Sequence, residues 1–164
     1  MSAIDEIIEA NKRYAERFDL GDLPNLPARK LAIVACMDAR LTVEQALGLK
    51  TGDAHIIRNA GGIVTEDVMR SLIISHHLLG TQEFMVINHT ECGMRTFKDE
   101  DLKQQLEEKT HTTAAIPIAF HTFLDLEENV REQVEKIKSH PWMPKDVPVR
   151  GFVYDIRTGK LHEV

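Results

Sequence analysis

Two cysteines and one histidine of this 164-residue chain are candidate ligands for a metal ion. Cys36 ends one apolar run, His89 ends a later one, and Cys92 follows three positions beyond His89. Two thiolates and one imidazole form a ligand set that suits zinc. The chain has only two cysteines, whereas a closed structural site normally takes a fourth Cys or His. We therefore expect an open site that keeps a water molecule, as catalytic zinc sites do.

Two alternatives to an open zinc site exist at the level of sequence. Another histidine could take the fourth position; the other histidines are His55, His76, His77, His111, His121, His140 and His162. Cys36 and Cys92 could also be buried apolar thiols without a metal role.

An acidic and a basic side chain follow Cys36 at alternate positions, Asp38 and Arg40. In an extended stretch, all three side chains would point the same way. The guanidinium of Arg40 would lower the pKa of Asp38 and keep it ionised. An ionised carboxylate only accepts hydrogen bonds, so Asp38 could hold a zinc-bound hydroxide by its proton and leave a lone pair free to attack. The alternative is an ion pair that steadies a loop.

Paired glycines follow another apolar run, in residues 58–62, RNAGG. The sequence contains no dinucleotide-binding or Walker glycine pattern, so we do not expect nucleotide binding. Gly61 and Gly62 permit close backbone approach, which could bring amide donors to Asp38 or to an anionic oxygen, and a tight turn is the equally simple interpretation. With Gly93, they are our candidates for substrate binding through the backbone.

Short apolar runs position these residues. They cover 31–36, 54–58, 84–89 and 149–156 and are nearly continuous in apolar character, which is typical of parallel strands covered on both faces. Residues 65–79 and 125–139 have helical periodicity. The sequence therefore predicts an α/β fold, a central, mainly parallel β-sheet flanked by helices. Ligands usually bind beyond the carboxyl ends of such strands, where the candidate residues lie.

Two further segments are predicted to lie outside this core. Residues 2–18 form an amphipathic helix with Ser2 and Asp5 as a capping box, and residues 21–27 contain a glycine and two prolines that prevent regular structure. Residues 99–113 are charged and predict a solvated helix and loop. We expect one domain over residues 1–164, with residues 1–27 as an N-terminal helical arm.

Composition excludes several classes of partner. The formal net charge is −6 and no basic run is present, which argues against nucleic-acid binding and against binding to anionic membranes. No apolar stretch reaches the roughly 18–20 residues of a membrane span, and the first residues do not resemble a secretion signal. Two cysteines in such a chain do not predict a disulfide framework. We expect a cytoplasmic protein.

Three motifs, in this order and spacing, resemble those of the β-class carbonic anhydrases. They are CMDAR at residues 36–40, RNAGG at 58–62 and HTECG at 89–93, and the resemblance continues through residues 155–159. It implies a zinc lyase that hydrates CO₂ to bicarbonate and a proton. It also implies one Zn²⁺ per chain on Cys36, His89 and Cys92, with Asp38 and Arg40 as the catalytic pair.

The resemblance carries further implications for assembly and substrate. It implies a homodimer or a dimer-based tetramer, with a sheet that extends across the dimer and an N-terminal helix on the partner. In some members the counterpart of Asp38 is a fourth zinc ligand in an inactive state. The chain is similar to the compact prokaryotic branch, which includes enzymes that act on carbonyl sulfide or carbon disulfide. A carbonyl sulfide or carbon disulfide hydrolase is therefore the alternative, and a zinc-stabilised scaffold without activity is a third interpretation.

Overall fold

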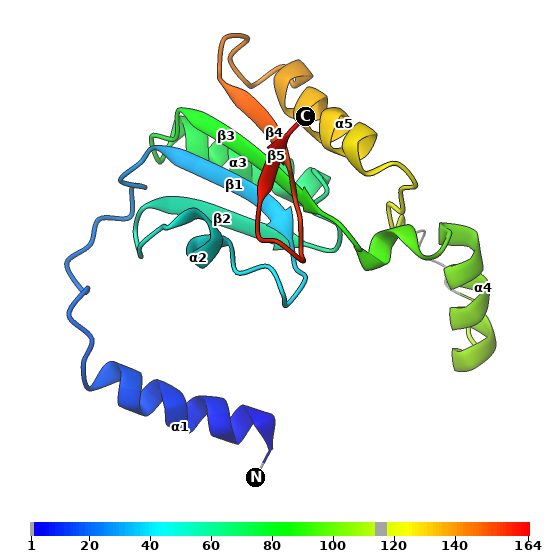
Figure 1. Ribbon diagram of the computed structural model, residues 1–164, viewed down its shortest axis with the longest axis horizontal. Coiled ribbons are helices and arrows are strands. Elements are labelled where there is room, and N and C mark those ends of the chain that lie inside the picture. Colours follow the sequence, from blue (N-terminus) through cyan, green and yellow to red (C-terminus); the bar gives the residue numbers. More distant parts are fainter. Residues whose placement is uncertain (1, 114–117) are drawn as a thin grey trace.

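A computed structural model describes residues 2–113 and 118–164 (Figure 1). The helices and strands occur in the order α1 (Ala3–Ala15), β1 (Leu31–Cys36), α2 (Val43–Leu47), β2 (Ala54–Asn59), α3 (Glu66–His77), β3 (Glu83–His89), the 3₁₀ turn η1 (Gly93–Arg95), α4 (Asp99–Thr110), α5 (Leu126–Ser139), β4 (Val149–Tyr154) and β5 (Leu161–Glu163). The predicted strands and long helices are confirmed. The last strand ends at Tyr154, two residues earlier than expected, because Asp155 begins the turn into β5.

The central sheet has the strand order β2-β1-β3-β4-β5. The first four strands are parallel and β5 pairs antiparallel with β4, so the predicted, mainly parallel α/β sheet is confirmed. Cys36 lies opposite Asn59, and His89 lies opposite Tyr154. The candidate residues that end β1, β2 and β3 therefore meet at the carboxyl edge of the sheet, where ligand sites form in open α/β folds.

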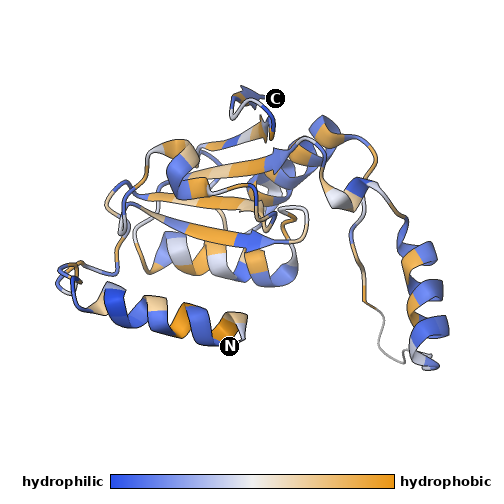
Figure 2. Ribbon diagram, turned by 60° about the horizontal axis from the view of Figure 1, so that its bottom comes forward, coloured by the Kyte–Doolittle hydropathy of each residue, from blue (hydrophilic) through white to orange (hydrophobic). Residues whose placement is uncertain are grey.

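Apolar side chains cover both faces of the sheet, as the continuous apolar runs predicted. Helices α3 and α5 pack on one face, and α2 with the C-terminal loop covers part of the other (Figures 1 and 2). Gly151 of β4 lets α5 approach closely, because a Cβ there would lie 2.5 Å from Cγ1 of Val130. The cluster under α3 and α5 includes Val34, Leu72, Val86, Val130 and Ile137, and the opposite cluster includes Ile33, Leu41, Val43 and Ile87.

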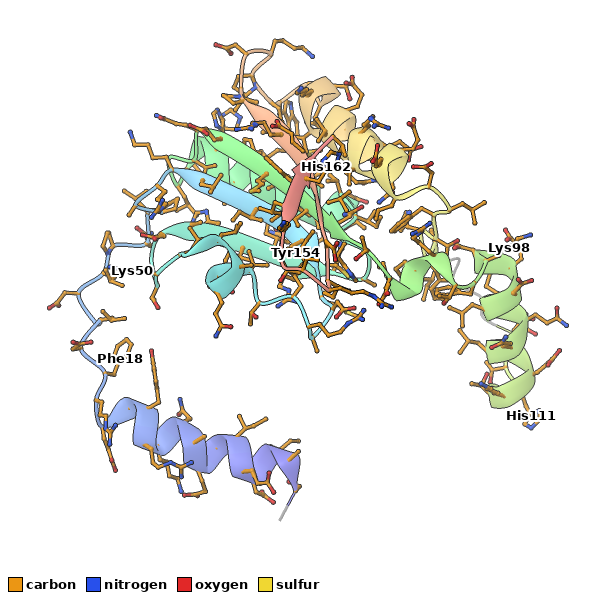
Figure 3. All side chains as sticks on the ribbon, in the orientation of Figure 1. Phe18, Lys50, Lys98, His111, Tyr154 and His162 are labelled. Carbon is orange, nitrogen blue, oxygen red and sulfur yellow. The ribbon has the colours of Figure 1, made fainter. Side chains whose placement is uncertain are left out.

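Helix α1 extends away from the body of the molecule (Figure 1). Its predicted capping box is present, because Ser2 and Asp5 bond reciprocally. The apolar side chains of α1 share one face, and none of its residues is buried against the described part of the chain; Ile4 and Ile7 are 70 % and 68 % exposed. The side chains of α1 and of neighbouring Phe18 stand clear of the sheet (Figure 3). Among the described residues, no helix has the length and apolar character that crossing a membrane requires.

Helix α4 is the solvated helix that the charged segment predicted, without a buried residue. Its first residue, Asp99, holds the segment that leads to α5 by hydrogen bonds. The Asp99 carboxylate accepts the backbone N–H groups of Phe120 (2.8 Å), His121 (3.3 Å) and Thr122 (3.1 Å) and the Thr122 hydroxyl (2.7 Å). These bonds, the Thr122 hydroxyl bond first, lower the pKa of Asp99 to about 2.

The Asp99 contacts predict a local change in Asp99→Ala. The pKa of Asp99 is lower in the folded chain than in the unfolded chain. The ionised carboxylate therefore stabilises this segment fully above the ordinary carboxyl pKa range, and the stabilisation disappears as the pH falls towards 2. At neutral pH, we expect the backbone amides of residues 120–122 to exchange faster in Asp99→Ala than in wild type. Wild type should lose the protection of these amides only in acid. Hydrogen exchange measures this. Asp101→Ala, on the same turn of α4, is the control. Equal protection in Asp99→Ala and wild type would contradict the prediction.

Candidate metal centre

Cys36, His89 and Cys92 come together at the carboxyl edge of the sheet. Their ligand atoms all lie within 4.8 Å of one another, and all three residues are buried. The Sγ atoms of Cys36 and Cys92 are 4.0 Å apart and form no disulfide. Cys36 ends β1, His89 ends β3 and Cys92 lies on the turn that follows. Because β1 and β3 pair in parallel, their last residues, Cys36 and His89, lie close together. The short turn after β3 brings Cys92 back towards them.

The hydrogen bonding of His89 tests whether a metal fits here. Nδ1 lies 2.8 Å from the carbonyl oxygen of Thr90, so Nδ1 carries the proton and donates it. Nε2 then offers a lone pair towards the two thiols. It is the one buried side-chain nitrogen or oxygen without a hydrogen-bond partner among the described residues, and such an atom is costly unless something binds it. In a metal-binding histidine, one ring nitrogen usually donates its proton to a carbonyl or carboxylate oxygen, and the other nitrogen offers its lone pair to the metal.

The two thiols differ in their acidity. The contact between the two Sγ atoms is the largest cause that lowers the pKa of Cys36; burial opposes it, and the backbone N–H groups of Asp38 and Gly61 add to it. The same contact raises the pKa of Cys92. The contact therefore favours one thiolate in the pair, whereas zinc binding requires both.

The structure brings Asp38 and Arg40 beside the three candidate ligands. Arg40 donates from Nε to Oδ1 of Asp38 (2.9 Å) and from Nη2 to Oδ2 (2.8 Å), and its backbone N–H also donates to Oδ1 (2.9 Å). These bonds hold the pKa of Asp38 well below its usual range, so the carboxylate is ionised. Oδ2 of Asp38 lies 3.6 Å from Nε2 of His89. A hydrogen-bond acceptor of fixed orientation thus faces the ligand cluster.

Two charged residues that the sequence reasoning did not assign hold this loop. Arg58 donates to the carbonyl oxygens of Cys36 (2.9 Å) and Asp38 (2.7 Å). Glu91 has a left-handed backbone (φ 56°), its carbonyl oxygen accepts a bond from Arg40 (3.2 Å), and its carboxylate pairs with Arg157. Arg58 and Glu91 both lie inside the motifs at residues 58–62 and 89–93. Their place in these motifs is the only feature of the sequence that could have identified them as functional residues.

The glycine turn packs directly against Cys36. Gly61 and Gly62 both have a positive φ (85° and 63°), and a Cβ at Gly62 would lie 3.0 Å from the backbone nitrogen of Cys36. The close backbone approach expected of these glycines is therefore present, within a tight turn. Gly93 starts η1, and apart from its two chain neighbours no described residue has an atom within 4 Å of the position of an added Cβ.

None of the other histidines joins the ligand cluster. Among residues 2–113 and 118–164, the group of potential ligands contains Cys36, His89 and Cys92 alone. His55 instead bonds Ser75 (2.7 Å) and His77 bonds the carbonyl oxygen of Trp142 (2.7 Å). The structure therefore favours three protein ligands and a fourth position that protein histidines do not fill.

The comparisons with known proteins agree with this geometry. Residues 31–161 match the family model described as "Carbonic anhydrase". The chain is 46 % identical to "Beta-carbonic anhydrase 1" of Mycobacterium tuberculosis over 164 residues, which cover 100 % of this chain and 99 % of the relative. It is also 35 % identical to a carbon disulfide hydrolase of Acidithiobacillus thiooxidans over 176 residues, which cover 96 % and 87 % of the two chains.

A solved structure extends the similarity to the fold. The crystal structure of a carbonic anhydrase from Streptococcus mutans superposes with a TM-score of 0.94 at 46 % identity, and the match covers 100 % of this chain and 98 % of that one. The matched region contains the strands, the ligand cluster and the Asp38–Arg40 pair. The chain therefore belongs to the β-carbonic anhydrase family.

Proposed function

We propose that the protein is a zinc-dependent carbonic anhydrase, a lyase that reversibly hydrates CO₂ to bicarbonate and a proton. The observation that carries this proposal is the unpartnered Nε2 of buried His89, which faces two thiols and lies 3.6 Å from an arginine-bound carboxylate. Cys36, His89 and Cys92 would hold one Zn²⁺ per chain. Zinc, when bound, lowers the pKa of a coordinated water and so supplies a nucleophile for CO₂ near neutral pH.

Asp38 would accept a hydrogen bond from the nucleophile and would remain ionised while doing so. Arg40 keeps the Asp38 carboxylate ionised and prevents its rotation by binding both oxygens, so that one lone pair stays directed at the ligand cluster. An acceptor in this position orients the nucleophile with its own lone pair towards the substrate carbon. We assign Asp38 the role of acceptor rather than that of a fourth ligand, because its carboxylate is not part of the group of ligand atoms that Cys36, His89 and Cys92 form.

Backbone N–H groups are the proposed contacts for substrate oxygen. Gly93 is the candidate with open space around it, next to Cys92. The N–H of Gly61 contributes to the lowered pKa of Cys36, so its first role is toward the ligand thiolate. Gly61 and Gly62 would therefore act on substrate mainly by keeping the backbone close to the site.

We favour CO₂ over sulfur-containing analogues because identity to the β-carbonic anhydrase is 46 %, against 35 % for the carbon disulfide hydrolase. Carbonyl sulfide and carbon disulfide are also linear molecules open to attack at carbon, so the alternative function uses the same residues. Parallel turnover measurements with the three gases separate the two assignments.

Stopped-flow CO₂ hydration near pH 8.5 tests the proposal, with protein shown to hold one zinc per chain and with chelator-treated protein as the control. Fast hydration that depends on zinc supports a carbonic anhydrase. Negligible hydration together with turnover of carbonyl sulfide or carbon disulfide would move the assignment to the hydrolase. Inactivity toward all three would favour a scaffold.

We propose a single domain over residues 1–164 whose arm, residues 1–27, packs on a partner subunit in a homodimer or a dimer-based tetramer. Three features support this. The apolar face of α1 is exposed. Strand β2 forms an edge of the sheet and is mostly half-buried. A groove of about 1240 Å³ runs between α3 and α5, lined in part by Met69, Ile73 and Trp142.

The arm predicts that Ile7→Asp shifts the protein from dimer towards monomer, because it places a charge in the centre of the apolar face of α1. Sedimentation velocity of the full chain measures the change. Arg13→Asp, on the opposite face of the helix, is the control and should leave the dimer intact. A dimer that persists in Ile7→Asp at micromolar concentration would contradict the packing of the arm.

We also place the protein in the cytoplasm. Two free thiols only 4.0 Å apart stay available as zinc ligands in a reducing compartment, whereas an oxidising one favours their conversion to a disulfide.

A further inference from the structure

A row of buried amide side chains connects helix α5 to the glycine turn beside Cys36. It consists of Asn88 at the end of β3 and Asn129 and Gln133 on α5, which are 1 %, 4 % and 1 % exposed. Buried amides are rare in apolar cores and are costly unless all of their hydrogen bonds are made. We call these three residues the amide row.

Each member of the amide row donates to the next. Gln133 donates from Nε2 to Oδ1 of Asn129 (3.0 Å), and Asn129 donates from Nδ2 to Oδ1 of Asn88 (2.6 Å). Asn88 in turn donates from Nδ2 to the carbonyl oxygens of Gly61 (3.0 Å) and Gly62 (3.4 Å). The row therefore ends on the turn that packs against a candidate metal ligand.

Backbone groups at both ends fix the orientation of every amide. At one end, the backbone N–H of Val64 donates to Oε1 of Gln133 (2.9 Å), and Nζ of Lys136 lies 3.1 Å from the same oxygen. At the other end, glycine carbonyls can only accept. Donors at one end and acceptors at the other allow a single arrangement, in which each amide oxygen faces the Val64 end of the row and each amide nitrogen faces the end at the glycine carbonyls. A change in one amide must then affect the next.

The amide row holds both sides of the ligand cluster. Asn88 directly precedes His89 in β3, and its amide nitrogen would lie only 2.9 Å from a Cβ at Gly62. The same Cβ would lie 3.0 Å from the backbone nitrogen of Cys36. Asn88 and the turn thus fill the space between the end of β3 and the end of β1, where two of the ligands are attached.

We propose that Asn129 and Gln133 are positioning residues for the metal centre, which act through Asn88 on the glycine turn that sets the place of Cys36. They touch neither ligands nor substrate. Partners outside the ligand shell commonly affect metal affinity by 10–100-fold, because they restrict the ligands to the binding geometry. The inference rests on the zinc assignment made above.

Zinc affinity and the ligand field separate positioning from a merely structural role. We would compare wild type with Asn129→Leu and Gln133→Met, which break the row at similar side-chain volume. The readouts are the zinc dissociation constant, by competition with a chelator, and the absorption spectrum of the Co²⁺-substituted protein. We expect zinc binding to weaken by about tenfold or more in both variants, with a changed Co²⁺ spectrum.

Ile137→Ala is the matched control. Ile137 lies on the same helix and is fully buried in the apolar core, so its loss lowers stability without breaking the row. This control should lower the melting temperature and leave zinc affinity and the Co²⁺ spectrum unchanged. The double variant Asn129→Leu/Gln133→Met should bind zinc about as weakly as either single variant, because a row that is already broken cannot be broken again.

Unchanged zinc affinity in the row variants, or an equal loss in Ile137→Ala, would overturn the proposal. If Asn129→Leu does not fold, the zinc affinity of Gln133→Met, at the end of the row away from the glycine turn, tests the proposal. Wild type that binds no zinc would refute the metal assignment itself, whereas zinc-bound wild type without CO₂ turnover would refute the proposed function and leave the positioning role intact.

Discussion

The Cys92→Ser variant is expected to lose its zinc and a large part of its stability. A serine hydroxyl stays protonated near neutral pH and is a poor zinc ligand, so only Cys36 and His89 would remain. Because metal binding is coupled to folding, loss of the ion removes stability as well.

Metal analysis of purified protein and thermal unfolding test this result. Wild type should hold about one zinc per chain, and Cys92→Ser well below a tenth of that, with a lower melting temperature. Met94→Leu, two residues further along, conserves volume and changes no ligand, so it should keep both properties. One equivalent of zinc retained by Cys92→Ser would remove Cys92 from the ligand set.

The parallel core was predictable because its signal is local and redundant. Four nearly continuous apolar runs separated by helical patterns leave few alternatives to a mainly parallel sheet. The ligand cluster follows from that topology, because strand ends of neighbouring parallel strands meet at one edge. Strand β5 escaped prediction, since its three residues, Leu161–Glu163, are all exposed and carry no apolar pattern.

The contacts around the ligands could not be predicted in the same way. Asn129 and Gln133 lie four positions apart on α5, beside the apolar positions Val130 and Ile137, and a helical pattern assigns such polar residues to the solvent. They are buried because the carbonyl oxygens of the glycine turn and the N–H of Val64 supply partners from distant parts of the chain. Pairing of this kind depends on tertiary structure, which the periodicity of a single helix does not contain.

The Asp38→Asn variant is expected to keep its zinc and to lose CO₂ hydration by a factor of about 100 or more. Asparagine has a similar shape, but only one of its two terminal atoms accepts hydrogen bonds. Oδ1 of Asp38 receives two bonds from Arg40, so the amide oxygen should take that position. The NH₂ group then replaces Oδ2, which lies 3.6 Å from Nε2 of His89. A donor would face the ligand cluster where the proposed mechanism requires an acceptor.

Zinc content and stopped-flow kinetics of the Asp38→Asn variant distinguish loss of the acceptor from loss of the metal, since Asp38 is outside the group of three ligands. Asp67→Asn is the control, because Asp67 also binds an arginine, Arg70, but on the surface of α3. It should hydrate CO₂ at the wild-type rate. Wild-type turnover in Asp38→Asn would reject the acceptor role, and joint loss of zinc and activity would instead make Asp38 a fourth ligand. Full zinc content with a rate at least a hundredfold lower would leave hydrogen-bond acceptance from the nucleophile as the role that the arginine-bound carboxylate performs.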